Sequence, residues 1–213
     1  MRLKRLQLAL FSSVAATALL VTGVSAQASP TPGTGEAIPA SDCTTPPRPI
    51  TFFGDFVQTP VSDAEKSYAD PTAMPQGAPP DEQTTAEINN AVRQIVACSN
   101  SGDVLRALAL FDDAYLRRTL DPEHKIDVEN ANKLVAENLA TPVDPTPDQL
   151  IVLIDVRNMV QLSDGRVAVV VESDGGVDNP EGTDVDLFIF TKTDSGWIVD
   201  EAVRNIDDIV AGS

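Results

Sequence analysis

The sequence predicts an α+β fold in which helices pack on an antiparallel sheet. Between residues 84 and 139, apolar side chains recur at the three- and four-residue spacing of amphipathic helices, whereas after residue 150 they alternate or form short buried runs. Two tripeptides with hairpin-turn chemistry, Ser163–Gly165 and Asp194–Gly196, interrupt the second half. Helices followed by strands that short turns connect are typical of α+β proteins with an antiparallel meander.

Residues 1–28 are predicted to be a secretory signal peptide. Basic residues precede an apolar run, Leu8–Val24, and small residues follow it as far as Ala28. A retained membrane anchor is the alternative, but the run is short for a span of about 20 residues and hydroxyl side chains interrupt it. We therefore expect a secreted protein, extracellular or periplasmic, that keeps no membrane attachment after cleavage.

The chain is strongly acidic, with 15 Lys and Arg residues against 32 Asp and Glu residues and a formal net charge of −17. Such a surface repels nucleic acid, which is therefore not expected among the partners. The acidic loop at residues 174–186 suggests calcium, which prefers clustered carboxylate oxygens, but its spacing does not fit an EF-hand loop. We predict no metal site and no cofactor.

Two cysteines, Cys43 and Cys98, are predicted to form a disulfide. Pairing is the default for cysteines of a protein sent to an oxidising compartment. The bond would tie an N-terminal arm to the first helix of the domain. The alternative is a reactive thiol at Cys98, but the sequence places no nearby Lys or His that would activate it.

Residues 29–83 form an arm that is rich in Pro, Ala and Thr and has little to bury. One segment of the arm differs, because Phe52, Phe53 and Phe56 fall close together in it. We expect this aromatic segment to pack on the domain as a short strand or a single helical turn. The alternative is that it docks on a partner protein.

Three helices are predicted after the arm. Thr84 and Glu87 have the spacing of a capping box, which would start the first helix. A Ser-Gly pair ends that helix, and Asp103 can cap the second. Asp127 is the predicted cap of the third, which continues to Leu139.

Four strands are predicted in the second half, at residues 150–162, 166–173, 185–193 and 197–204. The alternation in the first strand places Asp155, Arg157 and Met159 on one face. On a concave face, Asp155 and Arg157 would be a buried pair that orients a polar ligand group. On a convex face they would be a solvated ion pair. Residues 207–213 are expected to be a frayed tail.

Three segments resemble the nuclear transport factor 2-like superfamily, also called SnoaL-like or cystatin-like cone. They are Asn100-Ser101-Gly102-Asp103, Leu110-Phe111-Asp112-Asp113-Ala114 and Gly196-Trp197-Ile198-Val199-Asp200-Glu201. The resemblance covers residues 84–206, and with its arm the chain is similar to secreted bacterial members. It implies a sheet that curves strongly around a helix and encloses an apolar cone in which a ligand can bind. Because this scaffold hosts both enzymes and binding proteins, the resemblance predicts a fold more than a function.

The resemblance also implies candidate site residues. Members related to ketosteroid isomerase use an Asp base after the second helix, with Tyr and a protonated Asp as hydrogen-bond donors inside the cone. The nearest match to the base is Asp121, although its spacing is longer than the family's. Tyr115 is the candidate hydroxyl and Asp155 a second candidate carboxylate. The alternatives are a structural Asp-Pro turn at Asp121 and a core side chain at Tyr115.

The function predicted from these features is binding without catalysis. We expect a small apolar ligand in the cone, contacted by Tyr115, Asp155, Arg157 and Met159, or a protein partner on the outer sheet, which includes a homodimer through that sheet. One alternative is a lyase, isomerase or hydrolase that acts on a small apolar substrate through a pocket carboxylate, either Asp121 or Asp155. Another is a structural envelope protein whose cone its own side chains fill.

Overall fold

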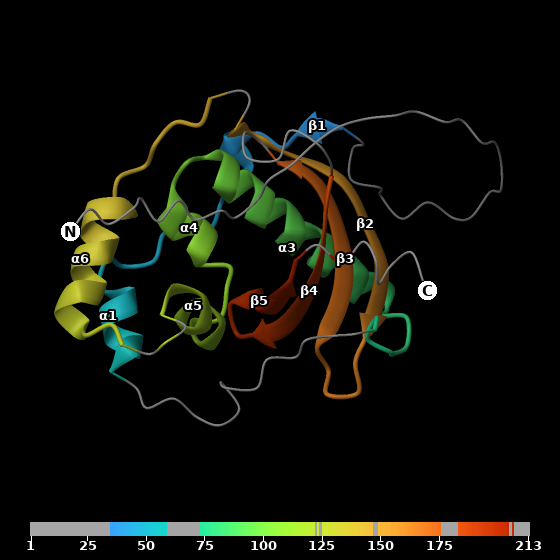
Figure 1. Ribbon diagram of the computed structural model, residues 1–213. Coiled ribbons are helices and arrows are strands. Elements are labelled where there is room, and N and C mark those ends of the chain that lie inside the picture. The colour runs from blue at the N-terminus through green and yellow to red at the C-terminus, as the bar shows by residue number, and fades with distance from the viewer. Residues whose placement is uncertain are drawn as a thin grey trace.

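The computed structural model describes residues 35–58, 73–121, 123, 125–146, 149–175, 183–204 and 206. The predicted signal peptide at residues 1–28 and the tail at residues 207–213 lie outside this set. The described chain has the predicted α+β architecture, with helices packed against an antiparallel sheet (Figure 1).

The helices are η1 (Ala40–Asp42), α1 (Phe52–Val57), α3 (Glu82–Asn100), α4 (Val104–Leu108), α5 (Asp113–Leu120) and α6 (Val128–Asn138). The strands are β1 (Glu36–Ala37), β2 (Ile151–Gln161), β3 (Val167–Gly175), β4 (Asp184–Thr193) and β5 (Gly196–Val203). The sheet has the order β1-β2-β3-β4-β5, and each neighbouring pair is antiparallel. The predicted meander is therefore confirmed, and β1 adds a short strand from the arm.

Helix α3 lies in the concavity of the sheet, which bends around it (Figure 1). Its buried face is the one that its helical periodicity predicts, and it includes Ile88, Val92 and Ile95. The predicted capping box is wrong, because the helix begins earlier and the Asp81 side chain accepts the Thr84 amide at 2.6 Å. Glu87 is thereby free of a capping role.

The predicted second helix corresponds to α4, and α5 is a further helix that the sequence does not predict. Asp103 caps α4 as predicted, and its carboxylate accepts the Arg106 amide. The chain then leaves the helix because Leu110 and Asp112 bond to β5 instead. The Val199 amide donates to the Leu110 carbonyl at 2.8 Å, and the Asp112 amide donates to the Val199 carbonyl at 2.8 Å. Helix α5 restarts with Asp112 as its N-cap.

Both faces of the central strands are buried, in two apolar clusters. Val167 and Val169 of β3 belong to the inner cluster, together with α3 and α5. Ala168 and Val170 belong to the outer cluster, which Ile206 also joins. A strand covered on both faces reads as a continuous apolar run, which explains the valine-rich sequence of β3.

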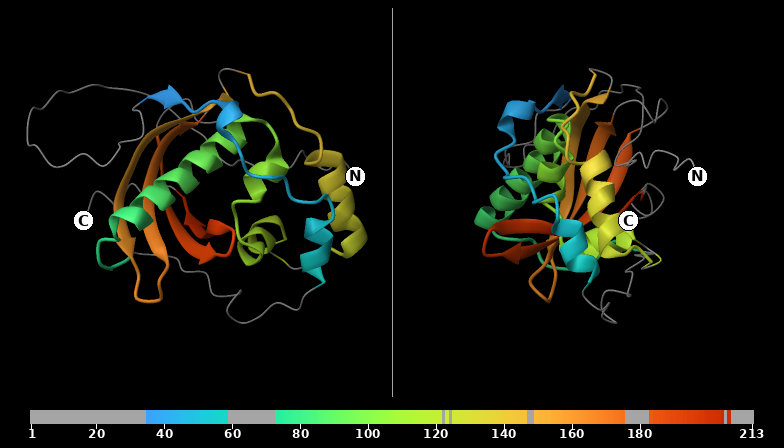
Figure 2. Two further views of the ribbon diagram at one scale, coloured as in Figure 1. Left: turned by 180° about the vertical axis from the view of Figure 1, so that it is seen from behind. Right: turned by 90° about the vertical axis from the view of Figure 1, so that its left-hand side faces the viewer.

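The described part of the arm packs against the domain more extensively than its composition predicts. Phe52 and Phe53 are buried in α1, so of the two forms expected for this segment, a short strand or a helical turn, the chain adopts the helical one. Helix α1 lies beside α6 (Figure 2), and the approach is so close that a Cβ on Gly54 would meet the Asn132 side chain at 2.3 Å. The predicted disulfide is confirmed: Cys43 and Cys98 are bonded with an S–S distance of 2.04 Å.

Candidate functional site

Asp121 closes the connection between α5 and α6. It is buried, and its two carboxylate oxygens accept the backbone amides of Lys125 at 2.9 Å and Ile126 at 3.1 Å. This is the geometry of the structural alternative for Asp121, because both oxygens serve to fix the loop.

Tyr115 lies in the inner apolar cluster as a core side chain. Its ring stacks on Phe111 with 5.5 Å between centroids, and the Arg118 guanidinium lies 6.0 Å from its centroid. Tyr115 therefore contributes aromatic packing between α5 and the segment that joins β5.

The prediction that Asp155, Arg157 and Met159 share one face is wrong. The register of β2 against β3 shifts between Arg157 and Val160, and Asn158 adopts a positive φ of 54°. Arg157 therefore pairs with Val170 of the outer cluster, whereas Met159 packs against the inner cluster. Such a bulge re-aims the residues that follow it, and alternation in the sequence does not reveal it.

Asp155 and Arg157 form an ion pair on the outer side of the sheet. Arg157 lies 3.6 Å from the Asp155 carboxylate and also bonds to Glu172 of β3, and all three side chains are partly exposed. This is the solvated-pair alternative. Because the sheet lies between this pair and the inner cluster, the structure does not bring Asp155 together with Tyr115.

A groove lies between α3, the β4–β5 hairpin and the arm, with a volume of about 660 Å³. We call this feature the groove. Its lining residues are Thr44, Thr45, Pro46, Glu87, Asn90, Ala91, Gln94, Ala109, Leu110, Lys192, Thr193, Asp194, Ser195, Gly196, Trp197 and Ile198. Four stretches of the chain build its walls, because Ala109 and Leu110 add to the arm, α3 and the hairpin, and both apolar and hydrogen-bonding groups face it.

Glu87 organises one wall of the groove. Its Oε2 accepts Trp197 Nε1 at 2.7 Å and Lys192 Nζ at 2.8 Å, and its Oε1 accepts Gln83 Nε2 at 2.8 Å. The hydrogen bond from Lys192, followed by those from Gln83 and Trp197, lowers the pKa of Glu87 to about 2. Glu87 is therefore an anion that fixes the Trp197 ring and the Lys192 ammonium in place.

Gln94 fixes the opposite wall, which the arm provides. Its Oε1 accepts the Thr44 amide at 2.9 Å and the Thr44 hydroxyl at 3.0 Å, while its Nε2 donates to the Asp42 carbonyl at 2.8 Å. The disulfide between Cys43 and Cys98 lies directly beside these contacts in sequence. A covalent bond and a side-chain clamp therefore hold the same turn of the arm against α3.

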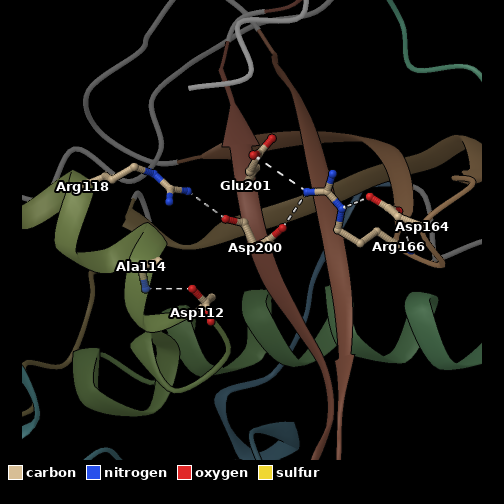
Figure 3. Close-up of polar contacts among 7 residues, drawn as sticks. All are labelled: Asp112, Ala114, Arg118, Asp164, Arg166, Asp200 and Glu201. Atoms are coloured by element: carbon tan, nitrogen blue, oxygen red, sulfur yellow. Dashed lines mark hydrogen bonds and ion pairs between the residues drawn. The ribbon is translucent and has the colours of Figure 1, made fainter. Parts of the chain in front are cut away.

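A second polar feature, the Arg166 cluster, consists of Asp164, Arg166, Asp200 and Glu201 (Figure 3). Arg166 lies 2.8 Å from the Asp164 carboxylate, 2.7 Å from that of Asp200 and 3.9 Å from that of Glu201. Arg118 of α5 approaches from the other side and donates to the Asp200 carbonyl at 3.1 Å. Asp200 is the extra residue at a register shift between β4 and β5, which turns its carboxylate towards Arg166.

Glu201 is the unusual member of the Arg166 cluster. Burial, opposed by Arg166 and reinforced by Asp200, raises the pKa of Glu201 above its ordinary value. Its Oε2 atom is buried and has no hydrogen-bond partner among the residues that the structure describes. Sequence reasoning did not identify Glu201, Glu87 or Trp197 as site residues.

The described parts of the chain hold no cluster of three or more His, Cys, Asp or Glu side chains that is arranged to bind a metal ion. Within the same parts, no helix combines the length and apolarity that a membrane span requires. The chain matches no protein-family model, no curated protein and no solved structure. The groove and the Arg166 cluster must therefore be interpreted from their own chemistry.

Proposed function

We propose that this chain is a secreted, non-catalytic binding protein whose ligand lies in the groove. We further propose that its curved sheet and α3 form the cone of the nuclear transport factor 2-like superfamily. The observation that carries the binding proposal is the set of fixed polar groups around Trp197. Glu87 and Gln94 hold opposite walls of a 660 Å³ groove by hydrogen bonds that are already in place, and a pre-organised site lowers the entropic cost of binding.

The cone interior is a weaker candidate for the ligand. Side chains of α3 and the sheet pack between these elements, and Ile88, Val92, Val169 and Phe190 each have an exposed fraction of 0%. A small apolar ligand would have to displace them. A dimer through the outer sheet is disfavoured for a related reason, since Val170 and Leu187 on that face are already covered.

The chain has one tryptophan, Trp197, so tryptophan emission, excited at a wavelength that the two tyrosines do not absorb, reports on the groove. We expect members of a library of small amides, alcohols and heteroaromatic fragments to shift Trp197 emission at saturating concentration. The variant Asn90→Tyr places a bulky side chain at an exposed lining position of α3 and should abolish these shifts. The matched control Ala86→Tyr, at an exposed position of α3 outside the groove, should retain them.

Two results would contradict the binding proposal. One is a library in which no fragment changes Trp197 emission. The other is a set of fragments that bind Asn90→Tyr as well as they bind the wild-type protein.

A second candidate function, a lyase, isomerase or hydrolase, draws support from Glu201 rather than from the residues that the sequence predicts. A partly buried carboxyl group with a raised pKa beside a cation suits acid–base catalysis. Its test is hydrolysis of generic ester and amide substrates by the wild-type protein and by Glu201→Gln. Turnover that the substitution leaves unchanged, or no turnover at all, would contradict this role.

A further inference from the structure

The groove borders an edge of the sheet, because β5 is the last strand in the sheet order. Part of that edge is already occupied. Val199 exchanges two backbone hydrogen bonds with Leu110 and Asp112, which gives a parallel bridge between Phe111 and Val199. The outer edge of β5 therefore already forms one parallel bridge, at Val199.

Trp197 presents the next pair of backbone groups on the same edge. In an antiparallel pair, successive residues direct their N–H and C=O groups alternately towards the neighbouring strand and away from it. Val199 directs its groups away from β4, so Trp197, two residues earlier and paired with Lys192, does the same. Among the described residues, none outside the sheet supplies a backbone partner to the N–H or C=O group of Trp197.

We propose that the groove binds an extended polypeptide segment of basic or neutral side chains, which pairs with the Trp197 backbone and continues the ladder that Phe111 begins. This inference rests on the proposed binding function and names its ligand class. An extended segment supplies alternating N–H and C=O groups, which is the requirement for adding a strand to a free sheet edge. The hydroxyl groups of Thr44, Thr45 and Ser195 line the same groove and suit further hydrogen bonds to such a segment.

The charge of the groove favours a peptide segment with basic side chains. Lys192 is paired with Glu87, which leaves the carboxylate of Asp194 as the uncompensated charge of the lining. The whole chain has a formal net charge of −17. Acidic segments, including a second copy of this chain, are therefore repelled, and segments that contain Lys or Arg are attracted.

The experiment titrates the full protein with two capped peptides, acetyl-Val-Lys-Val-Lys-amide and acetyl-Val-Glu-Val-Glu-amide. We expect the basic peptide to shift Trp197 emission and to slow hydrogen exchange at the Trp197 amide, and the acidic peptide to bind at least tenfold more weakly. Asp194→Asn should narrow this preference, whereas Asp144→Asn, at an exposed position outside the groove, should leave it unchanged.

N-methylation of one peptide amide at a time tests the strand pairing itself. Because only alternate amides of an added strand point towards β5, methylation at one amide should weaken binding about tenfold while methylation at its neighbour has little effect. Equal effects at all positions, or no protection of the Trp197 amide, would overturn the inference. Fragments that bind while neither peptide does would also overturn it and leave the proposed function standing, whereas the failure of fragments and peptides alike would overturn both.

Discussion

Glu87 and Glu201 show how the surroundings of one residue type decide its chemistry. Glu87 accepts hydrogen bonds from Lys192, Gln83 and Trp197, which stabilise its charged form and lower its pKa. Glu201 has a buried oxygen with no hydrogen-bond partner in the described part of the chain and lies 3.9 Å from Arg166, so burial dominates and raises its pKa. Ionisation of Glu87 therefore stabilises the fold, whereas ionisation of Glu201 destabilises it.

Replacement of Glu87 by Gln should lower the stability of the protein in a pH-dependent way. The pKa of Glu87 falls from its ordinary value of 4.5 to about 2 in the folded protein. Its stabilising contribution is therefore complete above the ordinary value and is lost as the pH falls towards about 2. Urea unfolding should show Glu87→Gln to be less stable than the wild-type protein near neutral pH, with the difference shrinking in acid. The exposed neighbour variant Glu82→Gln is the control, and a difference that does not change with pH would refute the prediction.

Replacement of Glu201 by Gln should have the opposite sign. A carboxyl group whose pKa is raised on folding favours the neutral form, so its ionisation destabilises the fold as the pH rises through the folded-state pKa. We expect Glu201→Gln to unfold at higher urea concentration than the wild-type protein at neutral pH, and at the same concentration in acid, where both side chains are neutral. If Glu201→Gln unfolds at a lower urea concentration than the wild-type protein at neutral pH, the prediction is wrong, and attraction to Arg166 outweighs burial.

At the scale of elements, local chemistry made most of the fold predictable. The four predicted strands match β2 to β5 to within two residues at each end, and Asp103 and Asp127 cap helices as expected. What the sequence could not reveal arises from contacts between distant segments. Helix α5 is separate from α4 because β5 captures Leu110 and Asp112, and the bulge at Asn158 turns Met159 away from Arg157.

The candidate site was largely unpredictable for the same reason. The groove takes a few residues from each of several stretches, none of which has a catalytic or ligand-binding motif. Gly196–Glu201 is one of the three segments that carry the family resemblance and contains both Trp197 and Glu201, yet only the fold places Trp197 against Glu87. The spacing of Thr84 and Glu87 predicted a capping role for Glu87 at the start of the helix, whereas its carboxylate lies at the groove.

Substitution of Gly102 measures how closely the chain packs at the end of α3, and Gly165 serves as the comparison. Gly102 and Gly165 both have a positive φ, but a Cβ on Gly102 would meet the Val143 carbonyl oxygen at 1.9 Å, whereas a Cβ on Gly165 would meet nothing within 4 Å. We expect Gly165→Ala to lower the free energy of unfolding by about 1 kcal/mol through backbone strain alone. Gly102→Ala should cost roughly 3 kcal/mol or more, because it adds a clash. Equal losses in urea unfolding would show that the approach of Val143 to α3 is not as close as the structure has it.

At the scale of the whole molecule, the arm is part of the domain and of the groove. Arg48 donates to the carbonyls of Leu108 and Phe111 and pairs with Asp113, while Phe53 is fully buried. These contacts hold the arm across α4 and α5, and Gln94 with the disulfide holds it on α3. Thr44, Thr45 and Pro46 of the arm therefore supply one wall of the groove.

Removal of the disulfide should lower the stability of the protein without changing the surroundings of Trp197 in the groove. Cys43 and Cys98 are 55 residues apart, so in the chain-entropy model their bond stabilises the fold by about 4 kcal/mol, mainly by restricting the unfolded chain. We expect Cys43→Ala/Cys98→Ala to lose stability on this scale in urea unfolding. Trp197 emission in the folded state should stay unchanged, because Glu87 fixes that ring independently of the arm.

The companion variant Gln94→Ala removes the side-chain hydrogen bonds that hold the same wall. It should change the stability little and the local structure of the wall more. It leaves the loop closed, so its stability loss should be only about 1 kcal/mol. However, hydrogen exchange at the Thr44 amide should accelerate, because Gln94 Oε1 is the acceptor of that amide. If the double cysteine variant accelerates exchange at Thr44 to the same degree, the disulfide and Gln94 are both needed to position the wall, and the prediction that Gln94 does so alone is wrong.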